Sequence, residues 1–201
     1  MKTPAHLAEV VLQPGQYWFG GGATRLRTVL GSCVAVTLWH PGRRVGGMCH
    51  YMLPERGAAG GLAAHGRRIE GRSIHESGRD GRSAHESGRD GRYGDEALAH
   101  LMREVQRIGG APGEFEAKLF GGGRMFREAR AGGGSALQVP GRNVQAGREL
   151  LLRHGFACKA EHVGGYGHRE VILDLPNGHV WVRHTPLREA QPPVSALGDL
   201  A

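Results

Sequence analysis

The chain has 201 residues and a formal net charge of +7, from 26 Lys and Arg against 19 Asp and Glu. That length allows one domain with a sizeable core. Basic residues are interspersed with acidic ones and form no stripe with interleaved aromatics, so we do not expect nucleic-acid binding. There is no apolar run of transmembrane length and no apolar segment of a secretory signal at the start, so we expect a cytoplasmic protein without membrane insertion.

Short strands separated by glycine-containing turns are predicted for the first quarter of the chain. Residues 33–39 alternate, which places Cys33 and Val34 on opposite faces of a strand. If Pro41 and Gly42 are the central residues of the next turn, antiparallel pairing places Cys33 opposite His50, and a slip of one or two residues still leaves them close. The strands predicted here are 10–12, 17–19, 26–30, 34–39 and 45–52.

The juxtaposition of Cys33 and His50 suggests a catalytic pair. A cysteine thiol is mostly protonated at neutral pH, and a neighbouring imidazole can accept its proton to give a nucleophilic thiolate. Three sparse cysteines do not suggest a disulfide framework, and we expect Cys49 and Cys158 to be small buried apolar residues. A zinc site formed by Cys33, Cys49 and His50 is disfavoured because adjacent strand residues point to opposite faces.

An insertion is predicted at about residues 56–92, where the composition changes to Gly, Arg, Ser and His. Two nearly identical decapeptides, GRSIHESGRD and GRSAHESGRD, stand there in tandem. With few apolar residues the segment cannot repay the entropy of ordering, so we expect a flexible surface loop. The spacing of His65, His75 and His85 could suggest a metal site, but the duplication explains the last interval and a mobile loop fixes no ligand geometry. No metal is predicted.

Two helices and four more strands are predicted after the insertion. Residues 94–108 form an amphipathic helix that ends at Gly109, and a second helix runs from Asn143 as N-cap to a stop at Gly155. The further strands are 117–120, 156–163, 169–175 and 179–184, the last two joined by an Asn-Gly turn, and residues 185–201 form an unstructured tail. The predicted class is α+β, with mixed or antiparallel sheets covered by two or three helices in one domain over residues 1–184.

The glycine run Gly121-Gly122-Gly123-Arg124 has the appearance of a phosphate-binding loop without its essential parts. It lacks the Gly-Lys-Ser/Thr ending and the strand-loop-helix spacing of a P-loop. We interpret it instead as a tight turn, or as a close approach of backbone near the catalytic cleft.

Five sequence blocks resemble the CheD family of bacterial chemoreceptor glutamine deamidases. They are TVLGSCVAVTLW, GGMCHYMLP, RYGDEALAHLM, EAKLFGGGRMF and GGYGHREVILDLPNGHVWVR. The resemblance implies a fold similar to CheD and to cytotoxic-necrotizing-factor-type cysteine deamidases. It also implies a hydrolase that converts glutamines of methyl-accepting chemotaxis receptors to glutamate, with Cys33 as nucleophile and His50 as base. Thr28 is the nearest match to the family's third catalytic residue, with Arg27 at the alternative position. His162 stands where the family pattern has aspartate.

The chemistry suggested by this pair requires no cofactor. Backbone N–H groups around Gly31, Ser32 and Val34 would stabilise the oxyanion formed when the thiolate attacks a carboxamide. The resemblance further implies hydrolysis of receptor glutamate methyl esters and binding to a CheC-like phosphatase. An alternative is a noncatalytic adaptor that binds receptors and such a phosphatase, because a fold alone does not secure activity.

Overall fold

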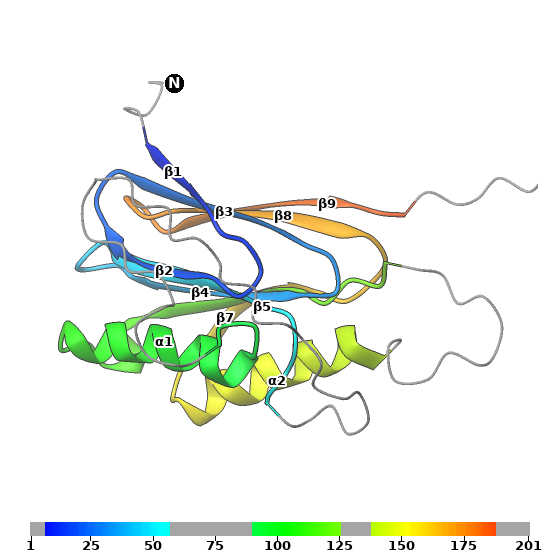
Figure 1. Ribbon diagram of the computed structural model, residues 1–201. Coiled ribbons are helices and arrows are strands. Elements are labelled where there is room, and N and C mark those ends of the chain that lie inside the picture. Colours follow the sequence, from blue (N-terminus) through cyan, green and yellow to red (C-terminus); the bar gives the residue numbers. More distant parts are fainter. Residues whose placement is uncertain (1–6, 57–89, 126–137, 188–201) are drawn as a thin grey trace, which may run out of the picture.

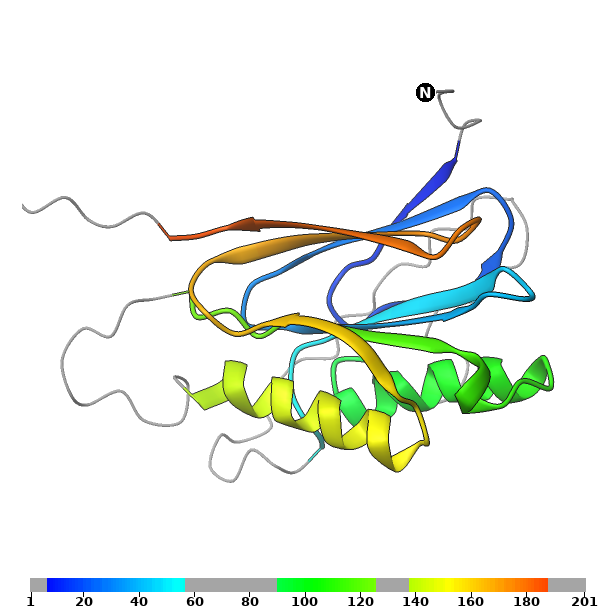
Figure 2. The same cartoon turned by 180° about the vertical axis from the view of Figure 1, so that it is seen from behind.

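Three layers make up the part of the chain that the computed structural model describes, residues 7–56, 90–125 and 138–187. A four-stranded sheet with the order β1-β3-β8-β9 lies over a five-stranded sheet with the order β2-β5-β4-β6-β7. Helices α1 (Gly94–Arg107) and α2 (Val139–Arg153) cover the other face of the five-stranded sheet, so this sheet is the central layer (Figures 1 and 2).

All nine predicted strands are present in the described residues, with ends that differ from the prediction by at most two residues. Neighbouring strands are antiparallel except for β1 with β3 and β6 with β7, which are parallel. The predicted α+β class with mixed sheets is therefore confirmed. The strands are β1 Ala8–Val11, β2 Tyr17–Gly21, β3 Thr24–Leu30, β4 Val34–His40, β5 Val45–Tyr51, β6 Glu116–Gly121, β7 Cys158–Val163, β8 His168–Asp174 and β9 His179–Thr185, and a 3-10 turn, η2, covers Pro112–Glu114.

Each face of the central sheet buries a separate apolar cluster. Val34 and Val36 of β4 pack in the cluster beneath the helices, whereas Ala35 faces the four-stranded sheet. Cys33 packs on the same side as Ala35, as the predicted alternation requires. One face of β4 thus packs in the core under the helices, and the other face lies on the side of the sheet that carries the cysteine.

The register of the β4–β5 hairpin differs from the prediction by two residues. His40 pairs with Val45, so the loop contains the four residues 41–44. The predicted turn is centred on Pro41 and Gly42. Arg44 lies in the left-handed region, with φ 51°, and its N–H donates to the His40 carbonyl. As a result Ala35, and not Cys33, is directly opposite His50.

The first helix follows the prediction closely, but the start of the second does not. Helix α1 ends before Gly109, whose φ of 65° favours glycine, and α2 ends before Gly155 in the same way. The prediction of Asn143 as N-cap of α2 is wrong, because the helix begins at Val139 with Pro140 in its first turn. Asn143 lies inside the helix and is fully buried.

Several sequence predictions concern segments that lie wholly or mostly outside the described residues. The duplicated decapeptides, apart from Asp90 at the end of the second, lie outside the described residues, as do His65, His75 and His85 and residues 188–201 of the predicted tail. The described ends that flank 57–89 meet at Glu96 of α1, which pairs with the Arg56 side chain at 2.6 Å and accepts from the Asp90 backbone N–H.

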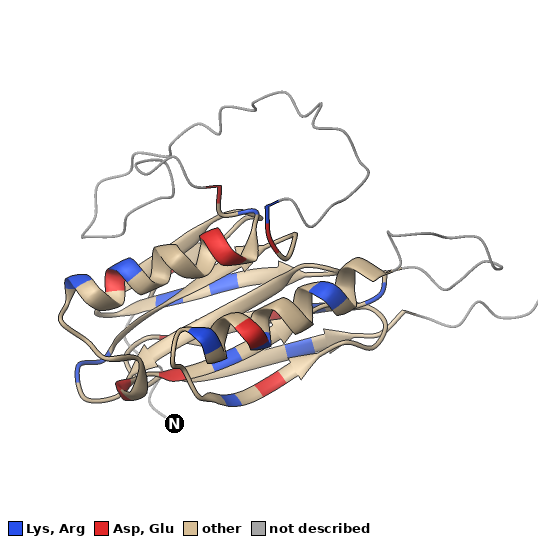
Figure 3. Ribbon diagram, turned by 90° about the horizontal axis from the view of Figure 1, so that it is seen from below, with Lys and Arg blue, Asp and Glu red and all other residues tan. Residues whose placement is uncertain are grey.

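The two cysteines predicted to be buried differ in exposure. Cys49 is buried, as predicted, but Cys158 at the start of β7 is exposed, so that prediction is wrong. Every residue of β7 up to His162 is exposed, because this strand is the edge of the central sheet. Both helices carry basic as well as acidic residues (Figure 3). Neither described helix combines the length and apolar character needed to cross a membrane.

Candidate active site

Cys33 ends a short connection that carries the chain from one sheet to the other. Residues 31–33, here called the cysteine loop, follow β3 of the four-stranded sheet and precede β4 of the central sheet. Cys33 is half-buried. The loop therefore presents the thiol at one end of the space between the sheets.

The glycine run after β6 holds the cysteine loop through backbone hydrogen bonds. Gly123 N–H donates to the Gly31 carbonyl and Gly122 N–H donates to the Cys33 carbonyl, both at 2.8 Å. Gly121 has φ 112°, and a Cβ there would lie 2.2 Å from the Cys33 carbonyl oxygen. The close backbone approach expected for this run is thus confirmed, and glycine is required for it.

Thr28 and His50 meet across the space between the sheets. Thr28 belongs to β3 and His50 to β5, and the Thr28 Oγ1 atom lies 2.8 Å from His50 Nδ1. The same hydroxyl donates to the Leu12 carbonyl at 2.8 Å. Because a hydroxyl has one hydrogen, it must accept the second bond from His50 Nδ1–H, which leaves Nε2 unprotonated in the neutral ring. Arg27 lies on the other face of β3 and pairs with Glu170.

The protonation states of the two candidate catalytic groups follow from their burial. Burial lowers the pKa of His50 to about 4, so the imidazole is neutral at pH 7. Burial also raises the pKa of the Cys33 thiol, against a smaller opposing effect from the Ser32 side chain. At neutral pH the Cys33 thiol is therefore protonated and the His50 imidazole is neutral.

Cys33 and His50 lie on the same face of the central sheet as diagonal neighbours. Ala35 is paired with His50, and Cys33 precedes it by two residues on that face. Such diagonal neighbours are typically about 7 Å apart at Cα, within reach of an aromatic side chain. His50 Nε2 is buried and has no hydrogen-bond partner among the described residues. Cys49 faces the opposite cluster, which separates it from any site that includes His50.

A family model described as "CheD chemotactic sensory transduction" matches residues 77–184. The chain belongs to the CheD family.

Curated CheD relatives match almost the whole chain. A protein of Pseudomonas savastanoi pv. phaseolicola named "Probable chemoreceptor glutamine deamidase CheD" is 43% identical over 93% of this chain and 90% of its own length. "Probable chemoreceptor glutamine deamidase CheD 3" of Dechloromonas aromatica is 40% identical over 90% and 89%. A third, "CheD 1" of Chromobacterium violaceum, is 38% identical over 90% of this chain and 80% of its own length. The resemblance to this family in the sequence blocks is confirmed.

This CheD family member also contains a buried arginine that sequence reasoning missed. Arg169 is 2% exposed; its Nε donates to His162 Nδ1 at 2.8 Å and its Nη2 donates to the Gly164 carbonyl at 2.5 Å. Its Nη1 has no hydrogen-bond partner among the described residues, and burial lowers the pKa of Arg169. His162 thus supplies a neutral acceptor to a buried cation.

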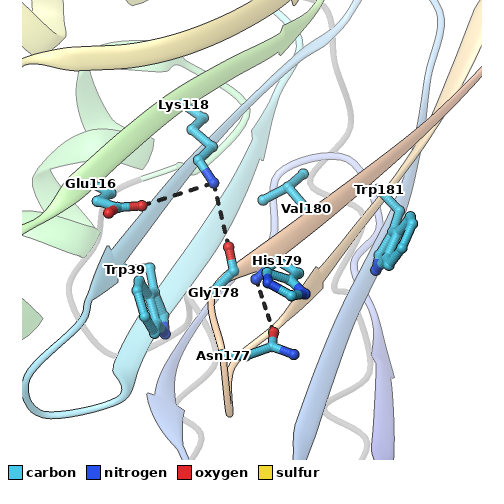
Figure 4. Close-up of a pocket in the computed structure, with 8 residues that line it drawn as sticks. All are labelled: Trp39, Glu116, Lys118, Asn177, Gly178, His179, Val180 and Trp181. Atoms are coloured by element: carbon cyan, nitrogen blue, oxygen red, sulfur yellow. Dashed lines mark hydrogen bonds and ion pairs between the residues drawn. The ribbon is translucent and has the colours of Figure 1, made fainter. Parts of the chain in front are cut away.

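A second feature of this CheD family member, a surface hollow of about 510 Å³, lies at the far end of β4 from Cys33. Trp39, Lys118 and Trp181 are among its lining residues (Figure 4). Lys118 Nζ donates to the Gly178 carbonyl at 3.3 Å and approaches a Glu116 oxygen at 4.0 Å. Lys118 is thus engaged by other residues of the lining, and the hollow is separate from the candidate site.

Proposed function

We propose that this chain is a protein-glutamine deamidase that acts on methyl-accepting chemotaxis receptors through Cys33, His50 and Thr28. The substrate class rests on the relatives, which are named chemoreceptor glutamine deamidases. The single observation that carries the mechanism is the 2.8 Å contact between Thr28 Oγ1 and His50 Nδ1. It fixes the tautomer in which Nε2, on the face shared with Cys33, can accept a proton.

In the first half of the reaction an amide becomes a thioester. His50 Nε2 removes the thiol proton as the Cys33 sulfur attacks the carboxamide carbon of a receptor glutamine, and the carbonyl electrons move to oxygen. The imidazolium then gives its proton to the amide nitrogen. The C–N bond breaks, ammonia leaves, and a γ-glutamyl thioester remains on Cys33.

In the second half water replaces the sulfur. The neutral imidazole of His50 removes a proton from water as the oxygen attacks the thioester carbon. The C–S bond breaks, the sulfur regains the proton from the imidazolium, and glutamate is released. A glutamate methyl ester can enter the same route with methanol as the leaving group, which makes receptor methyl ester hydrolysis a second reaction of the same site.

The oxyanion requires donors beside the sulfur, and the cysteine loop can provide them. In a planar trans peptide the C=O and the following N–H point in opposite directions. The Gly31 and Ser32 carbonyls both accept hydrogen bonds from within the protein, so the N–H groups of Ser32 and Cys33 point the other way. Val34 is paired on both sides in the sheet, which makes its N–H the weaker candidate.

The test is mass spectrometry of a receptor cytoplasmic fragment incubated with purified protein. The wild type should convert specific glutamines to glutamate, and Cys33→Ala should convert none. Cys158→Ser, which removes the exposed cysteine of β7, is the matched control and should retain full activity. Equal conversion by wild type and Cys33→Ala would remove Cys33 from the mechanism, and no conversion by either would favour the noncatalytic adaptor. Binding to a CheC-like phosphatase stays a prediction.

A further inference from the structure

The side chain of Asn143 joins the two chain segments that carry the candidate catalytic groups. Asn143 is on α2 and is fully buried. Its Nδ2 donates to the Ser32 carbonyl at 3.1 Å and to the Met52 carbonyl at 2.8 Å. Ser32 precedes Cys33, and Met52 follows His50 by two residues. One amide group therefore spans the end of the cysteine loop and the end of β5.

The orientation of this amide is fixed by its partners. Both partners are carbonyl oxygens, which only accept, so the NH₂ group must face them and both of its hydrogens are used. The Asn143 Oδ1 atom is buried and has no hydrogen-bond partner among the described residues. An unpaired buried oxygen and a poor helix-forming residue both reduce stability. Stability of α2 is therefore a weak explanation for asparagine here.

Building on the proposed function, we infer that Asn143 is a positioning residue for the reaction at Cys33. The Ser32 carbonyl and the Cys33 N–H belong to the same peptide group, so the bond from Asn143 also sets the direction of that N–H. This N–H is one of the two proposed oxyanion donors. The bond to the Met52 carbonyl holds the β5 end, and with it His50, at a fixed place relative to the cysteine loop.

Tyr51 adds a second link between β5 and the same residue of α2. Its hydroxyl donates to the Asn143 backbone carbonyl at 2.7 Å, and the side chain is buried. Tyr51 is adjacent to His50 in sequence and points to the helix side of the sheet. Helix α2 thus serves as the support against which the two halves of the site are aligned.

The first experiment compares Asn143→Ala with Leu150→Val in the receptor deamidation assay. Leu150 is a buried core residue of α2 that lies outside the site, so its variant reports a loss of packing alone. We expect Asn143→Ala to lower kcat on the order of 10- to 100-fold with little change in KM, because misplaced oxyanion donors act on the transition state. Leu150→Val should keep kcat within about twofold. An unchanged kcat in Asn143→Ala, or an equal loss in both variants, overturns the inference.

The second experiment measures Cys33 directly and needs no receptor. In a Cys158→Ser background, the rate of alkylation by iodoacetamide is followed against pH. We expect Asn143→Ala to slow alkylation near neutral pH, because Cys33 loses the base positioned beside it, and to approach the wild-type rate at high pH. An unchanged pH profile overturns the inference. If the wild type fails to deamidate receptors, the proposed function fails in the first assay, whereas this profile still decides the role of Asn143.

Tyr51→Phe keeps the inference testable if Asn143→Ala does not fold. The ring and its packing are retained, and the hydroxyl link to α2 is lost. We expect a smaller decrease in kcat than for Asn143→Ala, of several fold, again with KM little changed. A Tyr51→Phe protein with the melting temperature and kcat of the wild type would show that this link does not align the site.

Discussion

The substitution Thr28→Val tests the contact on which the proposed mechanism depends. Valine has nearly the shape of threonine but no hydroxyl, so packing between the sheets is largely retained. Two hydrogen bonds of 2.8 Å are lost, which leaves the Leu12 carbonyl and His50 Nδ1–H without their partner at a fully buried position. An unsatisfied buried polar group costs about 1–3 kcal/mol. Since the threonine hydroxyl no longer has to be buried, we expect the free energy of unfolding to fall by about 2–4 kcal/mol.

The effect of this substitution on the reaction is separate from its effect on stability. Without Thr28 as acceptor, the hydrogen bond that favours the Nδ1–H tautomer of His50 is lost, so the proton moves more readily from Nδ1 to Nε2. The Nε2–H tautomer cannot accept the thiol proton of Cys33, and the ring is also free to rotate. General base catalysis contributes about 10²- to 10⁴-fold, and we expect kcat to fall by part of this, on the order of 100-fold.

The assay is receptor deamidation followed by mass spectrometry at a temperature where all variants are folded, as judged by circular dichroism. Thr28→Ser is the matched control, because it keeps the hydroxyl and loses a buried methyl group worth about 1 kcal/mol. It should retain kcat within a few fold. A folded Thr28→Val protein with the kcat of the wild type, or equal losses in the serine and valine variants, would refute the assignment of Thr28.

Three other outcomes are expected. Because burial lowers the pKa of His50 to about 4, the imidazole stays neutral between pH 6.5 and 4, and kcat/KM should fall with acidification only near pH 4; an acid limb near pH 6.5 would contradict this. His162→Asp should supply a carboxylate to Arg169 and raise the free energy of unfolding, measured in urea at pH 7, by about 1–3 kcal/mol. A decrease would argue that the charge of Arg169 is already compensated. Titration with a thiol reagent should label Cys158 in the folded protein and Cys49 only after unfolding, since burial raises the pKa of Cys49 to about 12; early labelling of Cys49 would indicate that the core opens.

Local patterns in the sequence were sufficient to predict the strands and the shared face of the candidate pair. The alternation in residues 33–39 depends only on the pleat of a strand, and it places Cys33 and Ala35 on one side. The hairpin register could not be predicted as well, because the number of loop residues depends on whether Arg44 adopts a positive φ. The Pro41-Gly42 signal suggested a shorter loop than the one that forms.

The contacts that complete the candidate site come from segments far apart in the chain. Asparagine favours the N-cap position, so the sequence predicts Asn143 as a helix cap, whereas Pro140 marks the true first turn of α2. Its bonds to the Ser32 and Met52 carbonyls depend on how α2 packs under the central sheet. The Thr28 contact likewise depends on the packing of one sheet against the other, which no local pattern encodes.

One consequence of this arrangement concerns residues that never touch a substrate. Thr28 and His50 belong to different sheets, so the hydrogen bond between them forms only at the present spacing of the two layers. Met48 and Leu173 fill that spacing and are fully buried. Under the proposed mechanism, a substitution that shifts one layer relative to the other would disturb the contact between Thr28 and His50 and slow the reaction. The apolar residues between the sheets therefore affect the orientation of His50 without touching a substrate.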